Sequence, residues 1–280
     1  MSDRRDTPAN GRVAALHLEG QVEADRFVAA DSAQVATFTA GLHAAPGGAL
    51  DRQAIFGDLL DVYERRDGWA FVQGRKDGYC GYVREAALAA PVTPTHRLAV
   101  RASHIYPEAG MKQPPLHRLT FGAQLCVTDA DGKWAAVRWG GGTGLVHRSH
   151  LLPLDRPMPD PAASAALFLG TPYLWGGNSD AGIDCSGLVQ AACLAAHIPC
   201  PGDSDQQART VGTLLPDDAP LQRNDLIFWK GHVALVSDPE TILHANGGYM
   251  TTMYEPLADA LGRIEAAEGT RPFARRRLPA

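Results

Sequence analysis

Short segments in which apolar and polar residues alternate fill the first half of the chain, separated by turns rich in Gly and Asp. They predict strands at residues 34–39, 59–64, 69–72 and 80–83. Because these segments are short and bounded by turn residues, we expect them to form a small all-β unit over residues 13–91.

The same pattern returns in residues 92–154. The sequence GWAFV, which contains Trp69, is followed by GYV, and the chain repeats this as KWAAV, which contains Trp134, followed by GLV. Self-similarity at this period indicates a structural repeat. We therefore expect two copies of the small all-β unit, with the two tryptophans packed in their cores.

Prolines and a change of pattern mark a different region. Residues 155–163 contain three prolines and predict a linker. Residues 164–280 then mix helical and strand patterns, which predicts an α+β domain in which a helix faces a central antiparallel sheet. Its expected helices cover residues 162–170 and the segment after Asp184, its expected strands cover residues 225–230, 232–236 and 241–246, and further apolar segments follow at residues 250–255 and 273–278.

Composition and charge narrow the function classes. With 280 residues, 45% of them hydrophobic and 20% charged, the chain has the profile of a globular protein with two or more domains. The net charge of −5 argues against nucleic-acid binding, and we expect the arginines at residues 275–277 to form a solvated tail or a surface strand. Five irregularly spaced cysteines predict neither a disulfide framework nor a zinc site.

The N-terminal residues 1–12 are charged and lack a following apolar stretch. This pattern predicts disorder and the absence of a secretory signal. No apolar segment is long enough to span a membrane. We therefore expect a cytoplasmic protein with no membrane partner.

One cysteine, Cys185, falls where a helix is expected to begin, with Asp184 as its N-cap. Unpaired backbone N–H groups and the positive end of the helix dipole favour the thiolate there, which is the nucleophilic form. We expect Cys193 and Cys200 to be structural, as most buried cysteines are. Cys185 is therefore the candidate nucleophile, provided that a base lies nearby.

Two histidines on neighbouring expected strands supply that base. A hairpin with its turn at the Ser-Asp-Pro-Glu sequence would make His232 and His244 near-direct cross-strand neighbours on one face. Leu235 and Leu243 would then share the opposite face. His232 would take the proton of Cys185, while His244 fixes the tautomer of His232. The alternatives are two structural histidines, or a metal site formed by these three residues.

Five blocks of this region resemble the NlpC-type cell-wall peptidases: PYLWGG with Tyr173, DCSGL with Cys185, NDLIFW, GHVA with His232 and ILHA with His244. One departure is Asn224, where many members have glycine. The resemblance implies a papain-like cysteine peptidase fold that cuts γ-D-glutamyl–diamino acid bonds in peptidoglycan stem peptides. It implies Cys185 as nucleophile, His232 as general base and then acid, and His244 as the orienting residue.

The resemblance also assigns residues around the nucleophile. It implies that Tyr173 helps the backbone N–H of Cys185 to stabilise the oxyanion. Four small polar residues match positions that line the substrate pocket in relatives with two SH3-like domains: Asp184, Ser186, Asp203 and Ser204.

The first half of the chain resembles bacterial SH3-like domains through the pattern GW-x-x-V, GYV and a following leucine, present in two copies. Two such domains before an NlpC-type domain resemble the cytoplasmic muropeptide-recycling dipeptidyl-peptidases, in which the first SH3-like domain closes one end of the cleft. This resemblance implies that Asp58, where glutamate is common, and Tyr79 bind the free amine of an N-terminal L-alanine. Only peptides freed from the wall carry that amine, which agrees with the expected cytoplasmic location.

The leading hypothesis is therefore a cysteine peptidase that releases L-Ala-γ-D-Glu from free stem peptides in murein peptide recycling. Peptidoglycan-derived peptides are the expected partners, and we expect no nucleic acid, membrane, metal or other cofactor. The alternatives are a thiol amidase or acyltransferase, or a cell-wall endopeptidase, on the same fold, and a non-catalytic SH3-like wall-binding protein. The presence of Cys185, His232 and His244 argues against the last of these.

Overall fold

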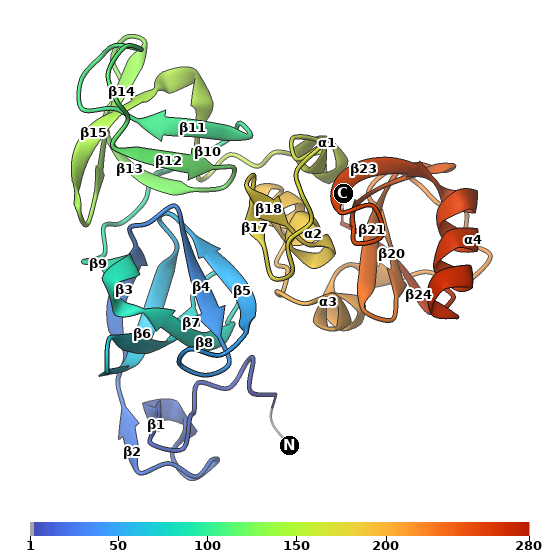
Figure 1. Ribbon diagram of the computed structural model, residues 1–280, viewed down its shortest axis with the longest axis horizontal. Coiled ribbons are helices and arrows are strands. Elements are labelled where there is room, and N and C mark those ends of the chain that lie inside the picture. Colours follow the sequence, from blue (N-terminus) through green and yellow to red (C-terminus); the bar gives the residue numbers. More distant parts are fainter. Residues whose placement is uncertain (1–2, 280) are drawn as a thin grey trace. The chain divides into compact units, whose positions relative to one another are not determined.

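The structure is a computed structural model, and it describes residues 3–279. The chain divides into two compact units, one that ends at Asp155 and one that begins at Arg156 (Figure 1). Each unit has its own hydrophobic core and is described separately. Among residues 3–279, no helix is both long enough and apolar enough to cross a membrane.

The first repeat of the N-terminal unit is a seven-stranded antiparallel sheet in the order β5-β4-β8-β7-β6-β3-β9. Its core is built from side chains of small to medium size, among them Val35, Leu60, Val72 and Val83. The elements are β3 (Asp31–Val35), β4 (Thr39–His43), β5 (Leu50–Ile55), β6 (Leu59–Arg66), β7 (Trp69–Gly74), β8 (Cys80–Arg84), the 3₁₀ turn η2 (Glu85–Ala87) and β9 (Leu88–Ala89).

The second repeat follows the same order of elements, so the predicted repeat is confirmed. Strands β13, β14 and β15, the turn η3 and strand β16 correspond to β6, β7, β8, η2 and β9, and Trp134 opens β14 as Trp69 opens β7. The elements are β10 (His96–Leu98), β11 (Ala102–Ile105), β12 (His117–Thr120), β13 (Gln124–Asp129), β14 (Trp134–Trp139), β15 (Gly142–His147), η3 (Arg148–His150) and β16 (Leu151–Pro153).

The turn after β5 joins the two repeats. Phe56 lies in the core of the second repeat, where its ring contacts Trp139, and its carbonyl accepts a hydrogen bond of 3.1 Å from the Gln124 N–H. Gly57 has a φ of 87°, and a Cβ there would collide with the Gln124 carbonyl. Only glycine fits this position, so the turn that carries Asp58 is held rigidly between the repeats.

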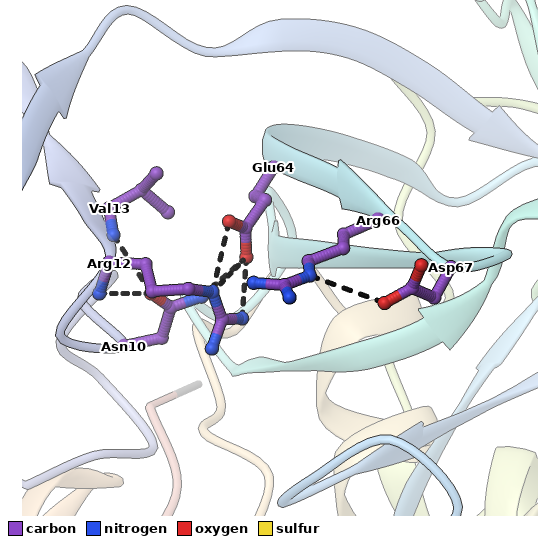
Figure 2. Close-up of polar contacts among 6 residues, drawn as sticks. All are labelled: Asn10, Arg12, Val13, Glu64, Arg66 and Asp67. Atoms are coloured by element: carbon purple, nitrogen blue, oxygen red, sulfur yellow. Dashed lines mark hydrogen bonds and ion pairs between the residues drawn. The ribbon is translucent and has the colours of Figure 1, made fainter.

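The N-terminal segment packs on the first repeat through polar contacts, as Figure 2 shows. Arg12 pairs with Glu64 on β6 at 2.7 Å, and the Asn10 side chain donates to the same carboxylate at 3.1 Å. The chain continues through β1 (Val13–Ala15), η1 (Leu16–Leu18) and β2 (Arg26–Val28). Disorder was expected for residues 1–12; residues 1 and 2 lie outside the described residues, whereas residues 3–12 differ from the prediction because these side chains find partners.

The C-terminal unit is a six-stranded antiparallel sheet in the order β19-β24-β20-β21-β22-β23, with α1 and α2 on one side and α4 on the other (Figure 1). This arrangement confirms the predicted α+β class. The elements are α1 (Pro161–Ala166), β17 (Asn178–Ser179), β18 (Gly182–Ile183), α2 (Cys185–Ala195), α3 (Ser204–Thr210), β19 (Thr213–Leu214), β20 (Asp225–Trp229), β21 (His232–Asp238), β22 (Thr241–Asn246), β23 (Thr251–Pro256), α4 (Leu257–Glu268) and β24 (Ala274–Arg277).

Two local features differ from the sequence-based expectations. The proline-rich segment at residues 155–163 already includes the first turn of α1, which Asp160 caps by accepting from the Ala163 N–H. The arginines at residues 275–277 lie in the half-exposed strand β24, so the expected strand is found and not the expected tail; what was not expected is its place between β19 and β20. Arg277 is held there by an ion pair of 2.8 Å with the buried Asp225.

Helix α4 was not predicted, and it covers one face of the sheet. Ala260 and Ile264 pack against Ala234 and Ile242 of the central strands. The helix ends at Gly269, which has the left-handed conformation typical of a helix C-terminus.

Candidate active site

Helix α2 begins at Cys185, as the sequence predicted, because Asp184 caps it. One carboxylate oxygen of Asp184 accepts a hydrogen bond of 2.6 Å from the Gly187 N–H and one of 3.0 Å from the Ser186 hydroxyl. The other oxygen accepts from the Gly176 N–H at 2.9 Å. Asp184 therefore holds both the helix terminus and the glycine turn before it.

The thiol of Cys185 lies against the start of β21. The side chain is only 5% exposed, and its Sγ lies 4.0 Å from the Gly231 carbonyl oxygen. The backbone N–H of Val233 also points to this sulfur. Gly231 and Val233 flank His232, so the thiol of Cys185 lies next to the backbone on either side of the candidate base.

The ionisation of Cys185 differs from the expectation. Burial and the nearby Asp184 carboxylate raise the thiol pKa to about 12, although backbone N–H groups of Val233, Ser186 and Cys185 itself favour the charged form. This pKa shift is opposite in direction to the one expected at a helix start, and it favours the protonated thiol in the resting protein. Burial could not be read from the sequence, and here it outweighs the helix terminus.

The two histidines are in contact, as predicted, with 2.9 Å between His232 Nε2 and His244 Nδ1. The expected near-direct pairing is wrong in detail. Leu235 faces Leu243 directly, and a bulge follows between Val236 and Asp238. Counted along this register, His232 lies two positions from the point opposite His244, so the imidazoles meet diagonally on one face.

Three residues that the sequence reasoning missed extend this contact. Glu255 Oε2 lies 2.9 Å from His244 Nε2, and Arg263 binds both carboxylate oxygens of Glu255 at 2.8 Å each. The Asn246 side-chain amide donates to Glu255 at 3.2 Å. A signal for α4 existed, because apolar residues recur at helical spacing before Gly269, but nothing in the sequence connected Arg263 to the site.

Burial and these charges determine which side chains of the site are ionised. Burial lowers the pKa of His232, helped by the positive charges that His244 and Arg263 carry when protonated. Burial also lowers the pKa of His244, against the opposing effect of Glu255. Burial opposes ionisation of Glu255, but the hydrogen bonds of Arg263 and the charge of His244 prevail and lower its pKa. At neutral pH the site therefore holds a thiol, two neutral imidazoles and a carboxylate.

Tyr173 lies near Cys185, the candidate nucleophile. Its backbone bridges to Ile183, two residues before Cys185, and its N–H donates to the Met250 carbonyl at 3.0 Å. Burial, then the negative charge of an ionised Cys185, raises the pKa of the phenol. Tyr173 therefore stays protonated and has a hydroxyl to donate.

Asp203 and Ser204 are placed at the start of α3, where Asp203 is the N-cap. The α3 side chain Gln207 donates to the Ser186 carbonyl at 2.9 Å. This contact brings the start of α3 next to the start of α2. Four of the predicted substrate-binding residues, Asp184, Ser186, Asp203 and Ser204, thus belong to two adjoining helix starts.

Asp58 and Tyr79 of the N-terminal unit line one pocket, together with Arg52, Gln53 and Lys76. The Asp58 carboxylate is 3% exposed, accepts from the Ile55 N–H at 2.9 Å and pairs with Lys76 Nζ at 2.5 Å. Tyr79 belongs to the core of the first repeat. The carboxylate predicted to bind a substrate amine therefore already has an ammonium partner.

Comparison with known proteins identifies the two regions. The profile of the NlpC/P60 family matches residues 170–261, and that of the bacterial dipeptidyl-peptidase Sh3 domain matches residues 42–88. The C-terminal unit is an NlpC/P60 domain. The matched residues of this NlpC/P60 domain include Cys185, His232 and His244, and the family places the chain in the cysteine-peptidase class.

The chain is similar to curated dipeptidyl-peptidases and to a solved structure of an NlpC/P60 family protein. The γ-D-glutamyl-L-lysine dipeptidyl-peptidase of Bacillus subtilis is 27% identical over 72% of this chain and 71% of its own length. The protein of that name from Bacillus cereus is 27% identical over 80% and 75%. The crystal structure of an NlpC/P60 family protein from Bacillus cereus has a TM-score of 0.77 at 21% identity, over 89% of this chain and all of that one, and confirms the fold.

Proposed function

We propose that this protein hydrolyses the γ-D-glutamyl–diamino acid bond of peptidoglycan stem peptides that carry a free N-terminal L-alanine, releasing L-Ala-γ-D-Glu. The observation that carries the proposal is the contact of a buried thiol with the start of β21 and of His232 with His244. The names of the curated relatives, which specify a γ-D-glutamyl-L-lysine bond, support the bond type.

The first half of the reaction forms an acyl-enzyme. As Cys185 Sγ attacks the γ-carbonyl carbon of D-Glu, His232 takes the thiol proton and becomes an imidazolium. The Cys185 N–H, at the start of α2, and the Tyr173 hydroxyl stabilise the oxyanion of the tetrahedral intermediate. His232 then gives its proton to the nitrogen of the diamino acid, the C–N bond breaks and the thioester remains.

Water completes the cycle. His232, neutral again, takes a proton from a water molecule that attacks the thioester carbonyl. Collapse of the second tetrahedral intermediate breaks the C–S bond and returns the proton to the sulfur. The products are L-Ala-γ-D-Glu and the shortened peptide, and no cofactor enters any step. An amidase or acyltransferase would share the first half and differ only in the acceptor.

The proposed substrate also indicates which reaction must come before this one. A free N-terminal L-alanine arises when an amidase has cut the peptide from its lactyl group. We infer that the protein acts in the cytoplasm, in murein peptide recycling, and that Asp58 and Tyr79 recognise the alanine ammonium. Asp184, Ser186, Asp203 and Ser204 offer polar groups for the amides and carboxylates of the stem peptide.

The direct test uses the full chain and synthetic L-Ala-γ-D-Glu-X peptides, with X either L-lysine or meso-diaminopimelate. We expect release of L-Ala-γ-D-Glu from at least one of them, loss of cleavage when the alanine amine is acetylated, and no activity in C185A with an unchanged melting temperature. Cleavage by C185A would overturn the mechanism. Equal cleavage of the acetylated peptide would overturn the requirement for a free amine.

A further inference from the structure

We propose that Glu255, clamped by Arg263, is a positioning residue that fixes the proton arrangement of His244 and, through it, of His232. The inference deepens the proposed peptidase function and rests on it for its catalytic meaning. Neither residue was predicted from the sequence.

The contacts determine which ring nitrogens carry protons. A carboxylate only accepts hydrogen bonds, so we assign the proton of the neutral His244 ring to Nε2, which lies 2.9 Å from Glu255 Oε2. The Asn246 amide nitrogen also lies 3.2 Å from this Nε2, but it is a donor as well, and we assign its hydrogen to Glu255 Oε2, also at 3.2 Å. His244 Nδ1 then has a lone pair and accepts from His232 Nε2–H at 2.9 Å. We therefore assign the lone pair of His232 to Nδ1, the nitrogen that takes the thiol proton.

Glu255 itself is held in a single geometry. Arg263 Nε and Nη2 donate to its two oxygens at 2.8 Å each, a bidentate pair that fixes the plane of the carboxylate. The Asn246 amide donates to Oε2 at 3.2 Å. Glu255 is almost fully buried. The carboxylate therefore cannot rotate away without leaving a buried charge unpaired.

The register of the sheet explains why these groups meet. Met253 faces His244 directly and Glu255 faces Ile242, so the Glu255 side chain lies on the face of His244 and diagonal to it. Ile242 packs against α4, which supplies Arg263. Cys185 comes from α2, on the other side of the sheet (Figure 1). The contacts from His232 through His244 and Glu255 to Arg263 therefore join the strand beside Cys185 to the helix on the other side of the sheet.

Because Glu255 and Arg263 carry opposite charges, their removal should shift the pKa of the histidine pair in opposite directions. Removal of the Glu255 charge takes away an anion that stabilises the protonated form of the His232–His244 pair. The pKa of the pair should therefore fall. Removal of Arg263 takes away an opposing cation, so the pair should keep its proton to higher pH. The other groups that face the site stay unchanged in both variants: Cys185 and Asp184 of α2, Tyr173 before it, Tyr249 beneath Arg263, and Glu268 of α4.

The kinetic test compares E255Q, R263Q and the double variant E255Q/R263Q in the full chain. We expect E255Q to lower kcat about 10- to 100-fold with little change in KM, by analogy with the range for residues that orient a metal-ligating histidine. The acidic limb of kcat/KM should move to lower pH in E255Q, to higher pH in R263Q and back towards that of the unchanged protein in the double variant. E265Q, which removes a charge from an exposed ion pair of the same helix with Arg271, is the matched control.

A measurement without substrate separates this inference from the proposed function. In a C185A background, the ring ¹⁵N shifts of His244 should report protonated Nε2 at neutral pH, and E255Q should mix the two tautomers. Both variants must keep the far-UV spectrum of the unchanged protein. A His244 tautomer that E255Q leaves unaltered, or acidic limbs that move in the same direction in E255Q and R263Q, would overturn the inference. If the peptides are not cut at all, the function fails and the tautomer result still decides this point.

Discussion

Asp184 has two effects on Cys185 at the start of α2. It fixes the position of the residue by capping the helix, but its charge makes the thiol harder to ionise. As N-cap, it satisfies the backbone N–H groups of Gly187 and Gly176. As a buried anion beside the thiol, it adds to the effect of burial and raises the pKa of Cys185. Cys185, the proposed nucleophile, is thus held at the helix start while its thiol stays protonated, and in the proposed mechanism its activation depends on His232.

The variant D184N separates these effects. Asparagine still caps Gly187 through its oxygen, but its amide cannot accept from the Gly176 N–H, and an unsatisfied buried donor costs about 1–3 kcal/mol of the free energy of unfolding. Loss of the charge lowers the pKa of the thiol, so iodoacetamide should modify Cys185 faster at pH 7. Denaturant unfolding and peptide mass mapping measure the two outcomes.

Cys80 in the same sample is the internal control, because burial raises its pKa to about 12 and Asp184 is not among the charges that act on it. Its modification rate should stay the same in D184N. A Cys185 rate that stays the same as well would show that the charge of Asp184 does not govern the thiol.

At the scale of elements, helix α2 is fitted closely against the glycine turn that precedes it. A Cβ on Gly187 would meet the side-chain oxygen of Asn178 and the carbonyl oxygen of Gly177. Gly262 in α4 has open space around it. The two helices of the C-terminal unit therefore respond differently to the same substitution.

We expect G187A to destabilise the protein by about 1–3 kcal/mol through overpacking, and to lower activity because the turn before Cys185 must shift. We expect G262A to stabilise it by about 0.5–1 kcal/mol, since alanine is the better helix residue. Urea denaturation curves of both variants test this. Stabilisation by G187A would show that the glycine turn before α2 can shift without cost and does not constrain the position of Cys185.

The elements near the site could be predicted from the sequence where local patterns determine them. The strand at Thr241–Asn246 and the helix start at Cys185 agree with the prediction, because alternation and an N-cap are local signals. The diagonal placement of His232 and His244 could not be predicted, since the bulge in β21 shifts the register.

The other features of the site that could not be predicted have a common physical cause. Glu255 and Arg263 meet through the packing of α4 on the sheet, a tertiary contact that no sequence spacing encodes. The ionisation of Cys185 depends on how much water reaches it, which follows from the complete fold. The Asp58–Lys76 pair likewise joins residues from different turns of the first repeat.

At the scale of the whole molecule, the chain combines an all-β unit of two repeats with an NlpC/P60 domain. The N-terminal unit contributes a buried ion pair, Asp58 with Lys76, whose partners are 3% and 19% exposed. A second pair in that unit, Asp61 with Arg75, is much more exposed. The two pairs allow a matched test of whether the N-terminal unit takes part in substrate recognition.

We expect D58N to raise KM for the free-amine peptide about tenfold or more, because a hydrogen bond to a charged group contributes about 1.5–3 kcal/mol. kcat should change little. D61N should leave both constants unchanged. Steady-state kinetics at several peptide concentrations give the comparison, and an unchanged KM in D58N would assign Asp58 to the Lys76 contact alone.

The protonated thiol also bears on how the protein withstands peroxide. Oxidants attack thiolates much faster than thiols, and with a pKa of about 12 almost no Cys185 is ionised at neutral pH. In the proposed mechanism the sulfur becomes reactive only when His232 takes its proton during attack on a substrate. A cysteine enzyme with a resting thiolate loses its nucleophile to sulfenic acid under oxidative stress, whereas we expect peroxide to oxidise Cys185 slowly when no substrate is bound.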